Sequence, residues 1–350
     1  MRHLRVVCVI SAVMGIGLLV YVSYKGYEKC PPINLSFQNQ DKHINEDGIY
    51  PLPERPKYKV ERSSDSVIPQ KFFRKKPGVS SHNYKWILNP YKACGEDEKE
   101  PPFLLVTIAS ASWEFERREL IRQTWASVRQ PFGKYVQYLF FVAKDPQSNN
   151  KLRKEFEKYN DLIQEDFNET YKNLTIKTQG QLKWATYFCP NARFIMHVDD
   201  DVFVDIKEIV KHLSSQAKRR ILHCAKVFMP QVRRDGKWEM NVKEYNGSKY
   251  PLSCVGWCFV MSKDVVSDLY FTSVDTHLIH LEDVTFTGIL RERIGNLQLK
   301  KIPNGESLCQ HKGWPKDRPT NDKLLEAWTQ LKNQNPNQKI RLVAGIPPMT

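Results

Sequence analysis

The stretch Arg193-Phe-Ile-Met-His-Val-Asp-Asp-Asp201 decides how this chain folds. Its apolar part, ending at Val198, is typical of a strand that is buried on both faces. The strand runs directly into three carboxylates, Asp199, Asp200 and Asp201. In sheets of parallel strands, ligands bind beyond the carboxyl ends of the strands. The stretch therefore predicts a buried strand that carries acidic side chains to a binding site.

Strand and helix patterns alternate on both sides of this stretch. Strands are predicted over residues 103–108, 136–142, 162–167, 221–228 and 255–261, and helices over residues 114–129, 152–159 and 174–188. Ser110 and Ser112 are candidate N-caps of the first helix. Such alternation predicts an α/β fold with a mostly parallel central sheet and helices on both faces.

The acidic triplet needs a counter-charge. Adjacent carboxylates repel one another, and a cation among them would keep them ionised. Their hard oxygen atoms suit Mg²⁺ or Mn²⁺, which would in turn bind a diphosphate. The competing interpretation is that the acids end a strand or cap a helix. We accept it for Asp205, because Asp205 and Glu208 fit the spacing of a capping box.

A second acidic pair, Glu282 and Asp283, opens a helical stretch that runs to Gly295. Acids are common in a first helical turn, where they favour the positive end of the helix dipole. In the functional interpretation, one of the two carboxylates is a general base. Near a metal-bound diphosphate, it could take a proton from an attacking hydroxyl.

The N-terminus predicts a membrane anchor. No charged residue occurs between Val6 and Tyr24, a length that can cross a hydrocarbon core. We expect residues 1–5 to be a cytoplasmic tail, 6–24 a transmembrane signal anchor, 25–95 a lumenal stem and 96–350 a lumenal domain. A cleaved signal peptide is the alternative, although no clear cleavage site follows the apolar segment.

The overall composition limits the class of protein. The 350 residues include 53 Lys and Arg against 39 Asp and Glu, for a formal net charge of +14, and 41% are hydrophobic. These values exclude collagen-like, coiled-coil and wholly disordered chains. Basic charge suits nucleic acid, a diphosphate or an anionic membrane surface. Because no zinc-finger, RNP or helix-turn-helix pattern occurs, we expect no nucleic-acid partner.

Sequons and cysteines agree with a lumenal domain. N-x-S/T sequons occur at Asn34, Asn168, Asn173 and Asn246. Outside the apolar segment there are seven cysteines, Cys30, Cys94, Cys189, Cys224, Cys254, Cys258 and Cys309. Their spacing predicts structural disulfides, with one thiol left over. Cys30 is the candidate for an intermolecular bridge, so a homodimer is compatible with the sequence.

Seven separated motifs together resemble the Golgi beta-1,3-glycosyltransferases. They are Arg118-x-x-Ile-Arg-x-Thr-Trp125, Asp166-Phe-x-x-x-Tyr-x-Asn-Leu-Thr-x-Lys-Thr178, Cys189-Pro-Asn-Ala192, Asp199-Asp-Asp-Val-Phe-Val204, Lys237-Trp238, Tyr250-Pro-x-x-Cys-x-Gly256 and Glu282-Asp-Val284. The match covers roughly residues 95–300, and no single motif would suffice.

The resemblance implies a GT-A nucleotide-sugar transferase fold, a Golgi type II membrane protein and Mn²⁺-dependent, inverting transfer from a UDP-sugar. Asp199 would contact the ribose or donor sugar, or the metal, with Asp200 beside it on the nucleotide. Asp201 would hold Mn²⁺ and Asp283 would be the catalytic base. His311 is a candidate third metal ligand, because imidazole can join carboxylates on Mn²⁺, but a structural histidine is the alternative.

Four further residues are candidates for nucleotide or sugar binding. Arg118, Arg122 and Lys177 could neutralise phosphate, although Arg118 follows Glu114 by four residues and could instead form a solvated ion pair. Trp238 could stack on a sugar ring, with core packing as the alternative. Trp125 is expected in the core.

The sequence departs from the family pattern at three places. Thr285-Phe-Thr-Gly288 stands where Tyr-Val-Gly is usual, which keeps the assignment of the second acidic motif but leaves the donor pocket undetermined. Cys224 and Cys258 stand where glycine is common. Because both lie in predicted neighbouring strands, we expect a Cys224–Cys258 disulfide, with two separate buried thiols as the alternative.

The sequence therefore predicts transfer of a hexose, first of all galactose, from a UDP-sugar to a glycoprotein or glycolipid glycan in a beta-1,3 linkage. N-acetylglucosamine and N-acetylgalactosamine are the alternative donors. A membrane-anchored glycan-binding protein or chaperone without turnover is the alternative of another class, and the intact acidic residues argue against it.

Overall fold

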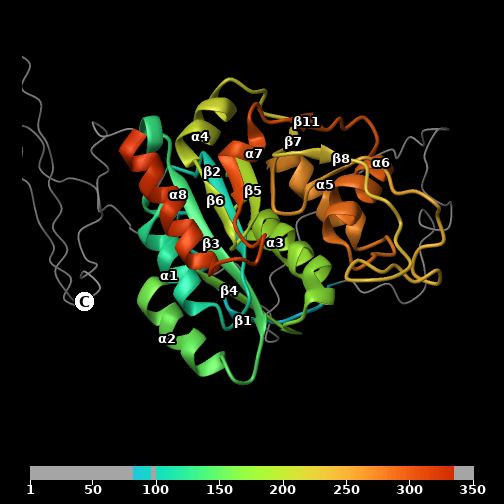
Figure 1. Cartoon of the computed structure of the whole chain (residues 1–350), viewed down its shortest axis with the longest axis horizontal. Helices are drawn as coiled ribbons and strands as arrows, with labels where there is room; N and C mark the ends of the chain where they lie inside the picture. Colours follow the sequence, from blue (N-terminus) through green and yellow to red (C-terminus); the bar gives the residue numbers. More distant parts are fainter. Residues whose placement is uncertain (1–81, 96–99, 335–350) are drawn as a thin grey trace, which may run out of the picture. The chain divides into compact units, whose positions relative to one another are not determined.

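A computed structural model describes residues 82–95 and 100–334, and its centre is an eight-stranded sheet (Figure 1). In spatial order the strands are β1 (Trp86–Leu88), β4 (Leu162–Asn168), β3 (Val136–Lys144), β2 (Leu104–Ala109), β5 (Phe194–Asp199), β10 (Cys258–Ser262), β7 (Leu222–Cys224) and β11 (Lys300–Lys301). Strands β4, β3, β2 and β5 are parallel, whereas β1 and β10 pair antiparallel with their neighbours. The mostly parallel sheet is confirmed.

Two small sheets lie beside the large one. They pair β12 (Cys309–His311) with β6 (Val202–Val204), and β8 (Val227–Phe228) with β9 (Ser253–Cys254). The β6–β12 pair is antiparallel and aligns Val202 with His311. This register brings a segment more than a hundred residues downstream to the end of β5.

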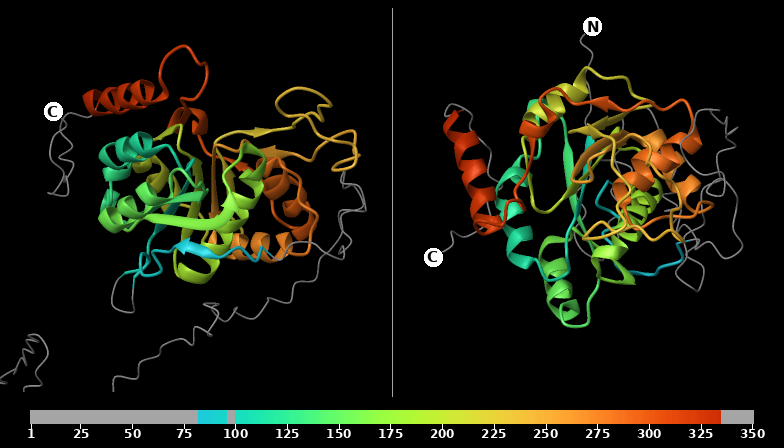
Figure 2. Two further views of the ribbon diagram at one scale, coloured as in Figure 1. Left: turned by 90° about the horizontal axis from the view of Figure 1, so that it is seen from below. Right: turned by 45° about the vertical axis from the view of Figure 1, so that its right-hand side comes forward.

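Helices cover both faces of the large sheet (Figures 1 and 2). The first face carries α1 (Phe115–Gln123), α2 (Asn149–Tyr159), α4 (Ile206–Ser214) and α8 (Thr320–Gln334), and the second carries α3 (Leu174–Phe188) and α5 (Lys263–Ser273). A π-helix, η5 (Val284–Leu290), continues into α6 (Arg291–Ile294), and α7 (Gly305–Leu308) precedes β12. Short 3₁₀ turns are η2 (Trp125–Ser127), η3 (Pro131–Gly133) and η4 (Tyr171–Asn173).

The alternation of side chains along β2 explains the two layers. Leu104, Val106 and Ile108 enter the core under the first face, whereas Leu105 enters the core under the second. All four side chains are fully buried, as expected for a central parallel strand with helices on both sides. Trp125 lies in the first core, as predicted.

The first helix is shorter than its hydrophobic pattern predicts. It ends at Gln123, because Thr124 leaves helical geometry and its hydroxyl donates to the Leu120 carbonyl oxygen at 2.7 Å. Ser112 does not cap this helix, since its hydroxyl donates to the Ala143 carbonyl oxygen at 2.6 Å. In contrast, the predicted Asp205 cap is confirmed, with its Oδ1 accepting from the Glu208 amide at 3.2 Å.

The sheet begins before residue 96, where the sequence analysis placed the start of the domain. Trp86–Leu88 forms β1 at the sheet edge, and Cys94 is bonded to Cys189 at the end of α3. The predicted tail, anchor and most of the stem lie outside the described residues, as do Cys30 and Asn34. Within residues 82–95 and 100–334, no helix is both long enough and apolar enough to cross a membrane.

The predicted Cys224–Cys258 disulfide is wrong. Cys224 is bonded to Cys254, with 5.2 Å between Cα atoms, and Cys258 to Cys309, with 6.4 Å. Cys224 lies opposite Phe259, the neighbour of Cys258 on β10. Because successive side chains on a strand point to opposite faces, the two predicted partners lie on opposite sides of the sheet.

Candidate active site

The acidic triplet lies at the carboxyl end of β5, as predicted. The Asp201 carbonyl oxygen accepts from the Lys312 amide at 2.7 Å, which holds the segment after β12 against the triplet. His311 Nε2 then lies 3.3 Å from Asp201 Oδ2. This hydrogen bond raises the pKa of His311, although burial opposes it. A Cβ on Gly313 would meet the Asp201 carboxylate, so the segment passes as closely as a residue without a side chain allows.

The middle carboxylate is held by a cation from α1. Arg117 Nη1 donates to Asp200 Oδ1 at 3.1 Å, and Arg117 Nε donates to Asn321 Oδ1 of α8 at 3.3 Å. Asp200 is almost fully buried, and its burial raises its pKa while Arg117 opposes the rise. Arg117 therefore links α1, α8 and the end of β5.

The second acidic pair lies at the start of η5. Asp283 Oδ1 accepts from the Val284 amide at 2.7 Å, which fixes one carboxylate oxygen at the helix N-terminus. Burial raises the pKa of Asp283 to about 6, while this backbone donor opposes the rise. A carboxyl group with that pKa is ionised at neutral pH and can still accept a proton, which is the requirement for a general base.

Gly256 and Trp257 connect the two acidic groups. A Cβ on Gly256 would lie 2.5 Å from Glu282 Oε1 and 3.5 Å from Asp283 Cβ. The carbonyl oxygen of Trp257 accepts from the Asp199 amide at 3.2 Å, and the centre of its indole ring lies 5.2 Å from that of the His311 ring. Two carboxylate groups that are more than 80 residues apart in the sequence therefore lie at one candidate site.

Electrostatic coupling agrees with this arrangement. The pKa of Asp199 is raised well above its ordinary value by burial, and further by Asp201 and Glu282. Burial and the neighbouring Asp283 raise the pKa of Glu282 to about 8. The site is therefore short of positive charge, and binding of a cation would lower these pKa values.

The residues at the triplet fit a divalent cation that would also be bound by substrate phosphates. No group of three or more His, Cys, Asp or Glu side chains within the described residues is arranged to hold a metal by itself. Asp201 and His311 could supply two ligand side chains, and Asp201 Oδ1 is buried without a hydrogen-bond partner within the same residues. Mg²⁺ typically takes one or two carboxylates together with substrate phosphates, and hard oxygen ligands suit Mn²⁺ as well.

Arg118 and Arg122 lie in a buried ion-pair network on the first face. Arg118 is fully buried, donates to both Glu155 oxygens at 2.8 Å, and is not in a solvated pair with Glu114. Arg122 donates to Glu155 at 2.6 Å and to both oxygens of Asp161. Their guanidinium groups are engaged with α2 and the start of β4.

Lys177 is also buried with protein partners. Its Nζ donates to Glu169 Oε1 at 2.6 Å and to the Ser110 carbonyl oxygen at 2.7 Å. It therefore joins α3 to the loop after β2. Ser110 in turn accepts from Arg118 at 3.1 Å, so this loop is held from both sides beside the triplet.

Trp238 remains available to a ligand, because 45% of its surface is exposed. It lies on the long loop between β8 and β9, with Arg233 above its ring at 5.3 Å. Lys237 Nζ lies 4.8 Å from the centre of the Tyr171 ring. Burial is the main cause that raises the pKa of Tyr171 to about 12, and the carboxylates of Glu282, Asp283 and Asp199 add to the rise. The loop therefore approaches the acidic site.

Sequence reasoning missed Arg117, Gly313 and Trp257. Nothing in the helical pattern separates Arg117 from the two neighbouring arginines that are buried. Gly313 follows the candidate ligand His311 by two residues. A glycine at that position was the signal in the sequence that the backbone there passes close to other groups of the site.

Comparison with known proteins gives the class to which this site belongs. Residues 116–300 match the family model described as Galactosyltransferase. Beta-1,3-galactosyltransferase 1 of Mus musculus and of Homo sapiens are each 34% identical over 223 residues, covering 62% of this chain and 67% of the relative. Beta-1,3-galactosyltransferase 2 of Homo sapiens is 30% identical over 233 residues, covering 64% of this chain and 54% of the relative.

Among solved structures, a mannosyltransferase from Pyrobaculum calidifontis in complex with GDP-Man and Mn²⁺ is similar with a TM-score of 0.35 and 13% identity, covering 73% of this chain and 75% of that one. The family model covers more than half of the chain. The chain therefore belongs to the galactosyltransferase family, and it is a hexosyltransferase.

Proposed function

We propose that the chain transfers galactose from UDP-galactose to a hydroxyl group of a glycoprotein or glycolipid glycan, forming a beta-1,3 linkage with inversion. The observation that carries the proposal is the position of Gly256 and Trp257. Gly256 lies against Glu282 and Asp283, and Trp257 accepts from the Asp199 amide, so the two acidic groups meet here. One carboxylate group can then serve the diphosphate end of a donor while the other serves the acceptor. The names of the relatives supply the sugar and the linkage.

In this reaction Asp283 acts as the base. It takes the proton of the acceptor hydroxyl as that oxygen bonds to the anomeric carbon, and the bond from that carbon to the diphosphate oxygen breaks. A single displacement of this kind inverts the anomeric centre. The Val284 amide donates to one oxygen of Asp283, and the other oxygen receives the proton.

The triplet serves the leaving group. Asp201 and His311 would hold Mn²⁺, with Asp199 beside them, and the ion would neutralise charge that grows on the departing UDP. Asp200 is oriented by Arg117 and would contact the nucleotide. Trp238 offers an exposed ring for stacking on a sugar.

The proposal includes the cellular setting that the sequence predicts. The chain is a single-pass type II Golgi membrane protein with its catalytic domain in the lumen. Three disulfides among residues 94–309 support this setting, since such bonds persist in oxidising compartments. Imaging of the tagged full chain with a Golgi marker, and protease protection of the domain, test this part.

UDP release from a panel of UDP-sugars, with and without Mn²⁺, tests the reaction. UDP-galactose should be the best donor, and Asp283→Asn should keep UDP-sugar affinity near wild type while losing turnover. Asp201→Ala should abolish stimulation by Mn²⁺ in a folded domain. Preference for UDP-N-acetylglucosamine or UDP-N-acetylgalactosamine would correct the donor, and no turnover with any donor would favour a glycan-binding protein.

A further inference from the structure

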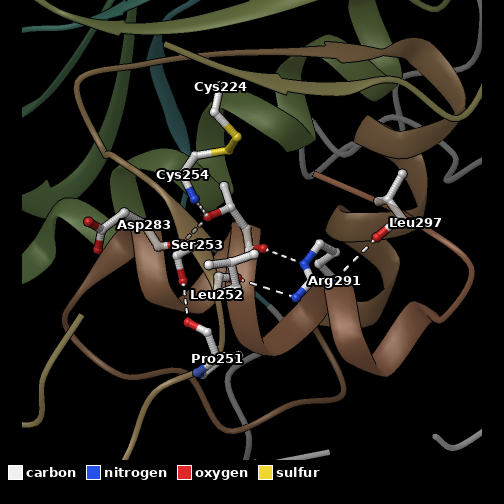
Figure 3. The surroundings of a disulfide bond; sticks show 9 residues. Cys224, Pro251, Leu252, Ser253, Cys254, Asp283, Arg291 and Leu297 are labelled. Carbon is white, nitrogen blue, oxygen red and sulfur yellow. Dashed lines mark hydrogen bonds between the residues drawn. A yellow bond between two sulfur atoms is a disulfide. The ribbon is translucent and has the colours of Figure 1, made fainter. Parts of the chain in front are cut away.

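Thr287 joins the backbone of the proposed base to a neighbouring strand. Its hydroxyl donates to the Asp283 carbonyl oxygen at 2.6 Å and accepts from the Cys254 amide of β9 at 2.8 Å. The side chain is completely buried within η5. Figure 3 shows Cys254 and Ser253 beside this part of the helix, with the Asp283 carboxylate pointing away from the disulfide. One hydroxyl therefore connects a fixed strand to the residue that carries the base.

The second of these hydrogen bonds makes Thr287 unusual. A threonine hydroxyl commonly donates to a carbonyl one turn earlier in a helix. Thr285, in the same π-helix, is also buried, and its hydroxyl donates to the Ile279 carbonyl oxygen at 3.0 Å. Among the threonines of the described residues, only Thr287 has a hydroxyl that also accepts a hydrogen bond from the backbone amide of a strand residue. Thr285 is therefore a natural control for Thr287.

The strand on the other side of this link is itself fixed. Cys254 is bonded to Cys224 of β7 (Figure 3). It also pairs with Val227 of β8. Arg291, at the end of η5, donates to the Thr287 carbonyl oxygen at 2.8 Å and to the Leu252 carbonyl oxygen at 3.3 Å. Movement of the helix relative to β9 would break the Cys254–Thr287 and Arg291–Leu252 hydrogen bonds together.

The helix also approaches β9 as closely as its residues permit. A Cβ on Gly288 would lie 2.6 Å from Ser253 Oγ and 2.8 Å from Pro251 Cγ, distances that real side chains do not adopt. A π-helix is a rare form that recurs at functional sites. In η5 it begins directly after Asp283, so the irregular turn and the proposed base share the same segment.

We propose that Thr287 is a positioning residue for Asp283, an inference that rests on the proposed role of Asp283 as the base. The hydroxyl fixes the Asp283 backbone against β9. The Val284 amide then holds one carboxylate oxygen, and the other oxygen is the one that takes the acceptor proton. Such a link acts on the reacting geometry and leaves donor binding unchanged.

Three variants of the full chain test the proposal. Thr287→Val keeps the shape but removes the hydroxyl, Thr287→Ser keeps the hydroxyl, and Thr285→Val removes the neighbouring hydroxyl. For Thr287→Val we expect kcat to fall by about tenfold or more with an unchanged KM for the donor, because a misplacement of about 1 Å can lower a rate on the order of a hundredfold. Thr287→Ser should restore most of kcat, and Thr285→Val should retain wild-type kcat.

A double mutant separates this proposal from the proposed function. If Thr287 acts through Asp283, then Thr287→Val should cause no further loss of the residual rate in an Asp283→Asn background. Full activity of Asp283→Asn would overturn the proposed base itself. An inactive Asp283→Asn together with equal kcat in Thr287→Val and Thr285→Val would overturn only the role of Thr287. Should Thr287→Val not fold, Thr287→Cys, with its weak donor and acceptor, should give an intermediate kcat, and wild-type kcat would refute the role.

Discussion

Replacement of Gly313 by alanine tests whether the close approach of this residue serves a metal. The new Cβ would lie 2.9 Å from Asp201 Cγ and 3.3 Å from His311 Cε1. Carbon atoms in contact are ordinarily about 3.5–4.0 Å apart, so the carboxylate must move by at least roughly 0.6 Å. Metal–ligand distances tolerate only about 0.2 Å. The displaced carboxylate should therefore lose much of its affinity for the cation.

The expected effect of Gly313→Ala is an increase of at least about tenfold in the Mn²⁺ concentration for half-maximal transfer, which corresponds to about 1.4 kcal/mol. Isothermal titration of Mn²⁺ in the presence of UDP should give the same shift without turnover. The free energy of unfolding without metal should change little, because the Asp201 carboxylate is partly exposed and can rotate away.

Gly133→Ala is the matched control. Gly133 has a φ of +70° in η3 and open space where a Cβ would be, so alanine there is strained without touching the acidic site. This control should destabilise the fold by about 1–2 kcal/mol and leave the Mn²⁺ response unchanged. A folded Gly313→Ala with a wild-type Mn²⁺ response would refute the reasoning.

Three further predictions follow from charges at the site. Transfer should decline as the pH falls below about 6, since Asp283 then gains the proton that it must accept. In the folded state the pKa of Glu282 is about 8, against an ordinary value of 4.5. Between pH 4.5 and 8 the folded protein therefore binds more protons than the unfolded chain does. Its free energy of unfolding without metal, measured in urea, should fall as the pH rises through this range. Arg117→Gln leaves the buried Asp200 carboxylate without its guanidinium partner, so the free energy of unfolding in urea should fall by about 1–3 kcal/mol. The control Lys211→Gln removes an exposed ion pair and should change this free energy by less than about 0.5 kcal/mol.

The sheet and both acidic groups were predictable because they depend on local pattern. Buried strands are continuous apolar runs, and the carboxyl end of such a run is where a parallel sheet places its ligands. The predicted helix over residues 174–188 matches α3 at both ends. Asp283 at the start of the second acidic helix also follows from chain order alone.

Residue contacts that depend on register and face were not predictable in the same way. The cysteine pairing required the alignment of β7 with β10, which shifts Cys224 to the opposite face from Cys258. The spacing of Arg118 and Arg122 indicates one helix face but not what covers it, and the cover proves to be α2 with Glu155.

The pairing of β12 with β6 has a consequence for the order in which the site can be made during synthesis. Every carboxylate of the site precedes residue 284, and the region of family similarity ends at residue 300. His311, Gly313 and the Cys309 half of the bond to Cys258 emerge later, as does Asn321, which holds Arg117. A nascent or truncated product that stops at residue 300 would thus contain all five acidic residues of the candidate site but lack His311, the proposed histidine ligand of the cation. We therefore expect the smallest active fragment to include Asn321 at the start of α8.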